Sequence, residues 1–242
     1  MDITWLDPFD PDYTFPHVET ALLNPEGLLA AGGDLSLNRL LKAYRSGIFP
    51  WYENGQPILW WSPDPRGVFF LDKFHISRSL RKALRKHPWK VTFDADFKQT
   101  VLACAAPRSY ARGTWITDEM ADAYTNLHQH GYAHSVELWD EHDQLVGGIY
   151  GVLIGKMFFG ESMFSSETNA SKITLTYLVA HLQAWGFTLL DCQLPSAHLS
   201  SLGAESLRRE DYINTIAPLC EETLTDFTWQ LDESIDVKFW KP

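Results

Sequence analysis

The stretch His134–Phe164, HSVELWDEHDQLVGGIYGVLIGKMFFGESMF, decides the fold. Its apolar residues alternate or run in short blocks, and polar or glycine-containing turns interrupt them at Glu141–Asp143 and Gly155–Lys156. Short apolar segments separated by such turns predict strands joined by hairpins. We therefore expect consecutive antiparallel strands of one sheet here.

Helices and further strands are expected on both sides of this stretch. The segment SKITLTYLVAHLQAWG (171–186) predicts a strongly amphipathic helix ended by its last glycine, and FTLLDCQL (187–194) predicts a short strand. Upstream, WKVTFDADF (89–97) predicts a strand, whereas FKQTVLACAAP (97–107) and DEMADAYTNLHQHG (118–131) predict helices. This order of elements predicts an α/β (α+β) fold with a mixed sheet, as in the acetyltransferase-like superfamily.

The N-terminal part of the chain has a different character. Its first 60 or so residues are rich in Pro and Gly, and only one short helix is predicted there, at Leu37–Arg45. We expect a small, irregular N-terminal domain at residues 1–64, followed by the α/β domain at residues 65–242.

Five aromatic residues lie within Gly47–Arg66, GIFPWYENGQPILWWSPDPR. Four prolines in the same segment exclude a regular helix and favour extended or turn conformations. A rigid loop that carries Trp suits stacking on the bases of a nucleic-acid end. The alternative is that the rings fill the junction between two packed layers. For the run as a whole we favour a binding surface.

The composition indicates an intracellular protein without a membrane segment. No stretch approaches the ~18 uncharged apolar residues of a membrane span, and the acidic N-terminus does not resemble a secretory signal. The three cysteines are widely separated, which favours a reducing cytosol. The sequence contains neither an HExxH nor a CxxC pattern, so no metal is implied. We expect a cytoplasmic monomer with no metal.

One segment is strongly basic in an otherwise acidic chain. The net charge is −11, yet Lys73–Lys90 contains seven Lys or Arg and no acid. A helix is predicted here, with Ser77 as its N-cap and Pro88 as its stop. A solvated helix face is the alternative, but such a face usually intersperses acids for i,i+4 pairing. The residues expected to bind phosphates are Arg78, Arg81, Lys82, Arg85 and Lys86.

Polar residues that could perform chemistry lie in two predicted strands. Asp191 and Gln193 are expected on one face of Leu189–Leu194, where burying them unpaired would be costly. Glu161 lies in the otherwise apolar KMFFGESMF, and a buried Glu is rare unless it is paired or bound to a ligand. A polar strand end with satisfied side chains is the alternative. The sequence contains no Ser–His–Asp elbow, P-loop, kinase motif set or coenzyme A pyrophosphate loop.

The sequence resembles the bacterial leucyl/phenylalanyl-tRNA–protein transferases in blocks that run in order from Gly27 to Ala204. Among them are GLLAAGGDL (27–35), AYRSGIFPWY (43–52), LWWSPDPR (59–66), HISRSL (75–80), FFGESMFS (158–165) and DCQ (191–193). The resemblance implies a small N-terminal domain on an acetyltransferase-like (GNAT-like) catalytic domain. It also implies transfer of Leu, Phe or, less well, Met from tRNA to the α-amino group of proteins that begin with Arg or Lys, which marks them for N-degron proteolysis.

The resemblance further implies roles for single residues. Asp191, Gln193 and Glu161 would form the polar catalytic centre. We predict that the Gln193 carbonyl accepts a hydrogen bond from the attacking amine and that Asp191 orients its amide. No nucleophilic side chain or cofactor is required, because the tRNA ester is already activated. The terminal adenosine would contact Trp51 and Trp115, and the aminoacyl side chain would enter a pocket around Ile149, Phe158, Leu175, Leu178 and Leu190.

One position departs from the family pattern, and two other functions stay open. Ser196 stands where some family members have Asn, so its role in substrate binding is in question. The first is a coenzyme A-dependent N-acetyltransferase that shares only the fold. Such an enzyme needs a pyrophosphate-binding loop, and this sequence does not contain one. A non-catalytic module that binds a tRNA end or a peptide would leave Glu161, Asp191 and Gln193 without a role.

Overall fold

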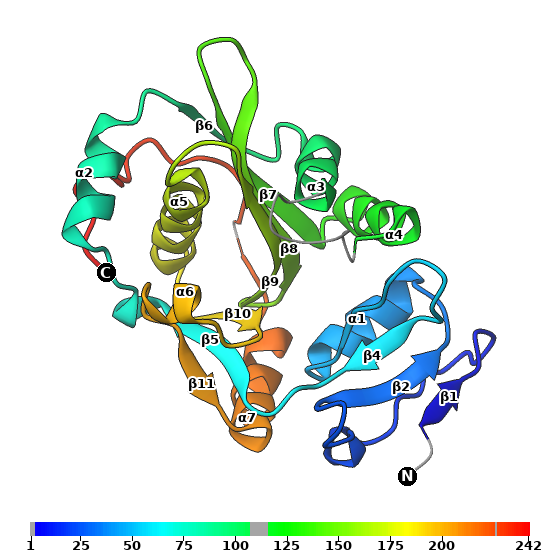
Figure 1. Ribbon diagram of the computed structural model, residues 1–242. Coiled ribbons are helices and arrows are strands. Elements are labelled where there is room, and N and C mark those ends of the chain that lie inside the picture. The colour runs from blue at the N-terminus through cyan, green and yellow to red at the C-terminus, as the bar shows by residue number, and fades with distance from the viewer. Residues whose placement is uncertain (1–2, 107–115, 226) are drawn as a thin grey trace.

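The computed structural model describes residues 3–106, 116–225 and 227–242. They form two mixed β-sheets with helices packed around them (Figure 1). The predicted α/β class with a mixed sheet is confirmed. The strands predicted within His134–Phe164 lie together in the larger sheet.

The larger sheet has the strand order β11-β5-β10-β9-β8-β7-β6. β9 and β10 pair in parallel, and the other neighbouring pairs are antiparallel. The β8–β9 turn passes through Gly155 at a φ of +57°, where an added Cβ would lie 2.4 Å from the Leu219 carbonyl oxygen. The strands are β5 (Arg66–Phe70), β6 (Lys90–Phe93), β7 (Ala133–Trp139), β8 (Leu145–Ile154), β9 (Met157–Ser165), β10 (Leu189–Gln193) and β11 (Glu205–Leu207).

Helices cover both faces of this sheet (Figure 1). α3 (Phe97–Ala105) and α4 (Asp118–Gln129) pack on one face, and α5 (Ala170–Ala184) packs on the other. The prediction that α5 is amphipathic is wrong, because its residues are buried without interruption from Ile173 to Leu182. The C-terminal segment, residues 227–242, covers the side of α5 that would otherwise face solvent. There the Asp232 N–H donates to His181 Nε2 at 3.1 Å. A helix covered on all sides needs no polar face.

The N-terminal part forms a second sheet, which corrects the irregular structure predicted for it. Its order is β1-β2-β4-β3, and the strands are only two to five residues long. Such short strands show no alternation that a sequence pattern could reveal. The predicted helix is confirmed as α1 (Leu37–Arg45). The strands are β1 (Thr4–Leu6), β2 (Leu28–Gly32), β3 (Phe49–Pro50) and β4 (Leu59–Trp61).

One hydrophobic core joins the two parts of the chain. Tyr44 and Trp60 from the N-terminal part are fully buried in the same cluster as Tyr150 and Phe159 of the larger sheet. The chain passes from one sheet to the other between β4 and β5. The division into domains at residues 1–64 and 65–242 stays a prediction.

The basic helix and the C-terminal helices complete the fold. α2 (Arg78–Lys86) begins after Ser77, whose Oγ accepts the Leu80 N–H at 3.2 Å, as predicted. α6 (Ala197–Ser200) and α7 (Arg209–Glu221) follow β10 and have no counterpart among the predicted elements. Within the described ranges no helix is long and apolar enough to cross a membrane. Single 3-10 turns lie at Val18–Thr20 and Leu71–Lys73.

Candidate active site

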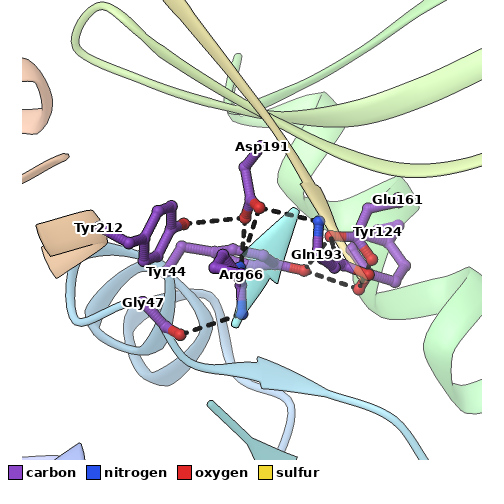
Figure 2. A network of polar contacts seen from close by, with 8 residues as sticks. All are labelled: Tyr44, Gly47, Arg66, Tyr124, Glu161, Asp191, Gln193 and Tyr212. Atoms are coloured by element: carbon purple, nitrogen blue, oxygen red, sulfur yellow. Dashed lines mark hydrogen bonds and ion pairs between the residues drawn. The ribbon is translucent and has the colours of Figure 1, made fainter. Parts of the chain in front are cut away.

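β10 ends in a left-handed turn. Gln193 has a φ of +61°, and the pairing of β10 with β5 shifts register between Asp191 and Gln193. A non-glycine residue in this conformation costs about 1–3 kcal/mol and persists only where its surroundings hold it. The regular alternation expected along Leu189–Leu194 therefore ends at Gln193, and the Asp191 and Gln193 side chains reach different partners (Figure 2).

Asp191 is fully buried and accepts four hydrogen bonds (Figure 2). Its Oδ1 accepts from Arg66 Nε at 2.9 Å and from the Gln193 N–H at 2.8 Å. Its Oδ2 accepts from Arg66 Nη2 at 2.6 Å and from Tyr212 Oη at 2.9 Å. A carboxylate offers about four lone-pair sites, so Asp191 has none left for a substrate group.

Arg66 is a site residue that the sequence-based prediction missed. It is 1% exposed, and its guanidinium lies 4.6 Å from the Phe49 ring and 4.8 Å from the Tyr212 ring. Burial lowers the pKa of Arg66, but the charge of Asp191, the neighbouring Tyr212 and the hydrogen bonds to both together outweigh this, so the pKa is raised and the side chain stays charged. A single Arg in the apolar strand RGVFF was the available signal, because a buried charge needs a partner.

Glu161 lies beside Gln193 and is 8% exposed. It accepts hydrogen bonds from Tyr44 Oη at 2.7 Å, Tyr124 Oη at 2.6 Å and Gln193 Nε2 at 2.9 Å. Burial raises the pKa of Glu161 to about 7, although the bonds from the two tyrosines act in the opposite direction. Glu161 can therefore gain or lose a proton near neutral pH.

The partner of the Gln193 amide differs from the prediction. Glu161 accepts from the side-chain Nε2 of Gln193, whereas Asp191 binds the main-chain N–H of Gln193. The predicted orientation of the amide by Asp191 is therefore wrong. Because Nε2 donates to Glu161, the carbonyl Oε1 is the atom of the amide that is left to accept from a substrate.

Tyr44 and Tyr124 were also missing from the predicted site. They lie in α1 and α4, so both parts of the chain contribute to the surroundings of Glu161. Burial and the neighbouring Glu161 raise the pKa of each tyrosine well above its ordinary value. Both therefore act as neutral hydrogen-bond donors.

Two cavities meet at Glu161, and Cys192 also lines both. The first has a volume of about 220 Å³ and is largely apolar. It contains three of the residues assigned to the aminoacyl pocket, Ile149, Leu175 and Leu190, together with the unpredicted Phe69, Met163 and Leu199. The second has a volume of about 210 Å³ and is lined by Phe49, Pro50, Trp51, Gln193 and Leu194.

Two residues assigned to the aminoacyl pocket line neither cavity. Phe158 and Leu178 are both fully buried in the core, where the Phe158 ring stacks on Trp229 with centroids 5.5 Å apart. Two larger hollows of about 650 and 710 Å³ lie along the C-terminal segment around Phe227, and Glu161 lines neither of them. Neither hollow is lined by Arg66, Asp191 or Gln193.

The aromatic run divides between core and surface. Trp60 is fully buried, and its Nε1 donates to the Gly32 carbonyl at 2.9 Å, so for this residue the packing alternative holds. Trp51 is 38% exposed, packs on Trp61 with ring centroids 5.4 Å apart, and lines the second cavity. The predicted binding surface is therefore limited to the rings near Trp51. Trp115 lies outside the described residues.

The five basic residues of α2 lie together around one surface hollow of about 370 Å³. Within the part of the chain that the structure describes, none of them forms an ion pair. The C-terminal segment contacts two of them: Arg81 Nη1 donates to the Trp240 carbonyl at 2.8 Å, and the Arg85 guanidinium lies 4.8 Å from the Phe239 ring. Lys82 and Lys86 remain exposed.

Ser196 caps a helix. Its Oγ accepts the Leu199 N–H at 3.2 Å at the start of α6, and the residue is exposed. It lines neither of the cavities at Glu161. Ser196 is therefore the N-cap of α6, the helix that follows β10.

Asp94, His128 and His134 could hold a metal ion by residue type, since their ligand atoms lie within 4.8 Å of one another. His134 Nδ1 lies 2.7 Å from Asp94 Oδ2, and His128 Nδ1 lies 2.8 Å from the Ala133 carbonyl oxygen. A metal bound through these nitrogens would have to break both hydrogen bonds. The cluster lies outside both cavities at Glu161, and we interpret it as a structural link between β6 and β7.

Comparison with known proteins identifies a family. Residues 68–217 match the model of the leucyl/phenylalanyl-tRNA protein transferase family, and residues 33–64 match the model of its N-terminal domain. A protein of Pseudomonas syringae pv. syringae named leucyl/phenylalanyl-tRNA–protein transferase is 56% identical over 94% of this chain and 97% of its own length. A protein of the same name from Pseudomonas syringae pv. tomato is 59% identical over 87% and 90%.

A solved structure, that of L-PGS from Bacillus licheniformis, overlays 62% of this chain and 48% of that chain with a TM-score of 0.40 and 13% identity, which is too distant to bear on function. The family assignment rests on the sequence relatives, because they match this chain over nearly their whole length. The chain belongs to the leucyl/phenylalanyl-tRNA protein transferase family and is a transferase.

Proposed function

We propose that this protein transfers Leu or Phe, and less well Met, from aminoacyl-tRNA to the α-amino group of proteins that begin with Arg or Lys. The observation that carries this proposal is the Glu161–Gln193 hydrogen bond at the junction of two cavities, one apolar and one bordered by Trp51. The modification marks its acceptor for N-degron proteolysis. The protein acts as a cytoplasmic monomer, without a cofactor or metal.

The apolar cavity suits the aminoacyl side chain. Ile149, Leu175 and Leu190 present only aliphatic atoms, which favour Leu, Phe and Met over polar side chains. Discrimination by a few methylene groups is limited to about 1–3 kcal/mol, so a mixed preference for these three side chains is the expected result. The ester carbonyl then lies near Glu161 at the rim of the cavity.

The second cavity and α2 suit the tRNA. Trp51 is partly exposed and offers a ring on which the terminal adenine can stack, with Trp115 as its predicted partner. The exposed cations of α2 supply contacts to the acceptor-stem phosphates. The net charge of −11 over the whole chain favours a cationic N-terminus on the acceptor protein.

The reaction joins the acceptor's α-amino nitrogen to the aminoacyl carbonyl carbon and breaks the ester bond to the tRNA ribose, whose oxygen leaves with a proton. The Gln193 Oε1 accepts a hydrogen bond from the attacking amine and so orients it. Glu161 in its ionised form takes the proton from the amine and passes it to the leaving ribose oxygen; its pKa of about 7 lies close to the value near 8 of an α-amino group.

A transfer assay tests this proposal. The protein is mixed with leucyl-tRNA and a peptide that begins with Arg, and the peptide mass is measured. We expect the mass to rise by one Leu residue, and no rise for the same peptide with an acetylated N-terminus or with Ala in the first position. If tRNA binds but no peptide gains mass, the protein is a binding module. If only acetyl-coenzyme A supports modification, the tRNA-dependent reaction is wrong.

A further inference from the structure

Arg66 connects three separate parts of the chain beneath the active site. Its Nη1 donates to the Gly47 carbonyl at 3.3 Å, its Nε and Nη2 donate to Asp191 in β10, and its guanidinium lies against the Tyr212 ring of α7 (Figure 2). The side chain is fully buried and charged, a state that is costly unless its geometry is well satisfied. This cost indicates that Arg66 has a role other than packing.

Asp191 links Arg66 to the backbone of Gln193 through hydrogen bonds to both residues. The same oxygen that accepts from Arg66 Nε also accepts the Gln193 N–H at 2.8 Å. With all its acceptor sites filled, Asp191 can neither touch the substrate nor take its proton. Its remaining role is to hold the main chain at the point where β10 leaves its register with β5.

The turn at Gln193 needs such support. The left-handed conformation is unfavourable for a glutamine, and it is what directs the Nε2 amide to Glu161 at 2.9 Å. The chain after the turn also packs closely on β5: a Cβ added to Gly67 would lie 2.9 Å from the Leu194 carbonyl carbon. Arg66 and Gly67, adjacent in β5, thus fix the turn from one side.

We propose that Arg66 is a positioning residue for the transfer reaction: through Asp191 it holds Gln193 in the left-handed turn that places the Gln193 amide beside Glu161. The inference rests on the proposed function of Glu161 and Gln193. Arg66 itself touches no substrate. It acts because Gln193 orients the attacking amine only when its backbone is held in this turn.

The test is Arg66→Lys, which keeps the charge but loses the planar fork that binds both Asp191 oxygens. We expect kcat to fall about 100-fold, as for a small misplacement of a catalytic group, with KM for aminoacyl-tRNA near the wild-type value. Arg39→Lys is the matched control, because Arg39 is equally buried, pairs with Asp34 at 3.0 Å and donates to the Asp7 carbonyl. It should lose stability similarly and keep its kcat.

Tyr212→Phe provides a second variant if Arg66→Lys does not fold. It removes one donor to Asp191 and keeps the ring, so kcat should fall by a smaller factor, again without a change in KM. Crystal structures of either variant should show Gln193 leaving the left-handed region.

Two outcomes must be distinguished. A wild-type protein that transfers nothing to the Arg peptide overturns the proposed function, and the role of Arg66 with it. A wild-type protein that transfers, alongside Arg66→Lys and Tyr212→Phe variants that keep the wild-type kcat or lose activity only in proportion to the unfolded fraction, overturns the role of Arg66 alone.

Discussion

At the scale of single residues, the decisive feature is a carboxyl group that titrates near neutral pH. Burial raises the pKa of Glu161 from its ordinary value of 4.5 to about 7, so the group is ionised above this pH and protonated below it. The tyrosines and Gln193 all donate to it, which fixes both oxygens in place. Sequence alone identified Glu161 as unusual, because it is an acid in an apolar strand.

We predict that Glu161→Gln lowers kcat by about 10²–10⁴-fold, the range expected when a general base is removed. The pH dependence of kcat/KM for the acceptor peptide gives a sharper result. Both Glu161 and the amine must lose a proton, so its logarithm should rise with a slope of about 2 below pH 7 in the wild type and about 1 in the variant.

Glu137→Gln is the control for this change. Glu137 is also fully buried, burial likewise raises its pKa, and it accepts from Thr92 and the Ala95 N–H away from both cavities. Its substitution should leave the slope unchanged. Equal slopes in the wild type and Glu161→Gln would remove Glu161 from the proton transfer.

At the scale of elements, α2 presents cations that have no acidic partner among the residues that the structure describes. We predict that Lys82→Gln raises KM for aminoacyl-tRNA, leaves kcat unchanged and reduces the slope of log KM against log salt by about 1, as for one phosphate contact. Lys98→Gln in α3, also exposed, is the charge-matched control. If both variants show the same small effect, the tRNA does not lie on α2.

The face of α5 that borders the first cavity should set substrate preference. Leu175→Ala would enlarge this cavity and favour Phe over Leu in kcat/KM, by a factor of about 10 within the range open to apolar pockets. Leu182→Ala in the same helix removes the same atoms from a buried position that does not line the cavity. It should cost a similar ~2–5 kcal/mol of stability and leave the preference unchanged.

At the scale of the whole molecule, the two sheets share one core and the site lies where they meet. Tyr44 of α1 reaches Glu161 of β9, and Arg66 of β5 reaches the Gly47 carbonyl. We predict a single cooperative thermal transition, measured as agreement between the calorimetric and van't Hoff enthalpies. Two separate transitions would instead support independent domains at residues 1–64 and 65–242.

Much of the larger sheet followed from local sequence. Alternation, helix caps and glycine stops act between residues a few positions apart, so the strands around Gly155, the cap at Ser77 and the helix Leu37–Arg45 were predicted. The unusual side chains Glu161, Asp191 and Gln193 were also visible, because polar residues in apolar strands stand out. The family resemblance rested on similarly local blocks.

The partners of these side chains were decided only by the tertiary structure. Arg66 and Asp191 are 125 positions apart, and Tyr44 and Glu161 are 117 apart. No local pattern encodes such pairs, because they form only when the sheets and helices pack and exclude water from the charges between them. The same packing covers α5, buries Phe158 and Leu178, and turns the backbone at Gln193. The sequence thus singled out Glu161, Asp191 and Gln193 as candidate residues, and the packing of the chain determined what each of them touches.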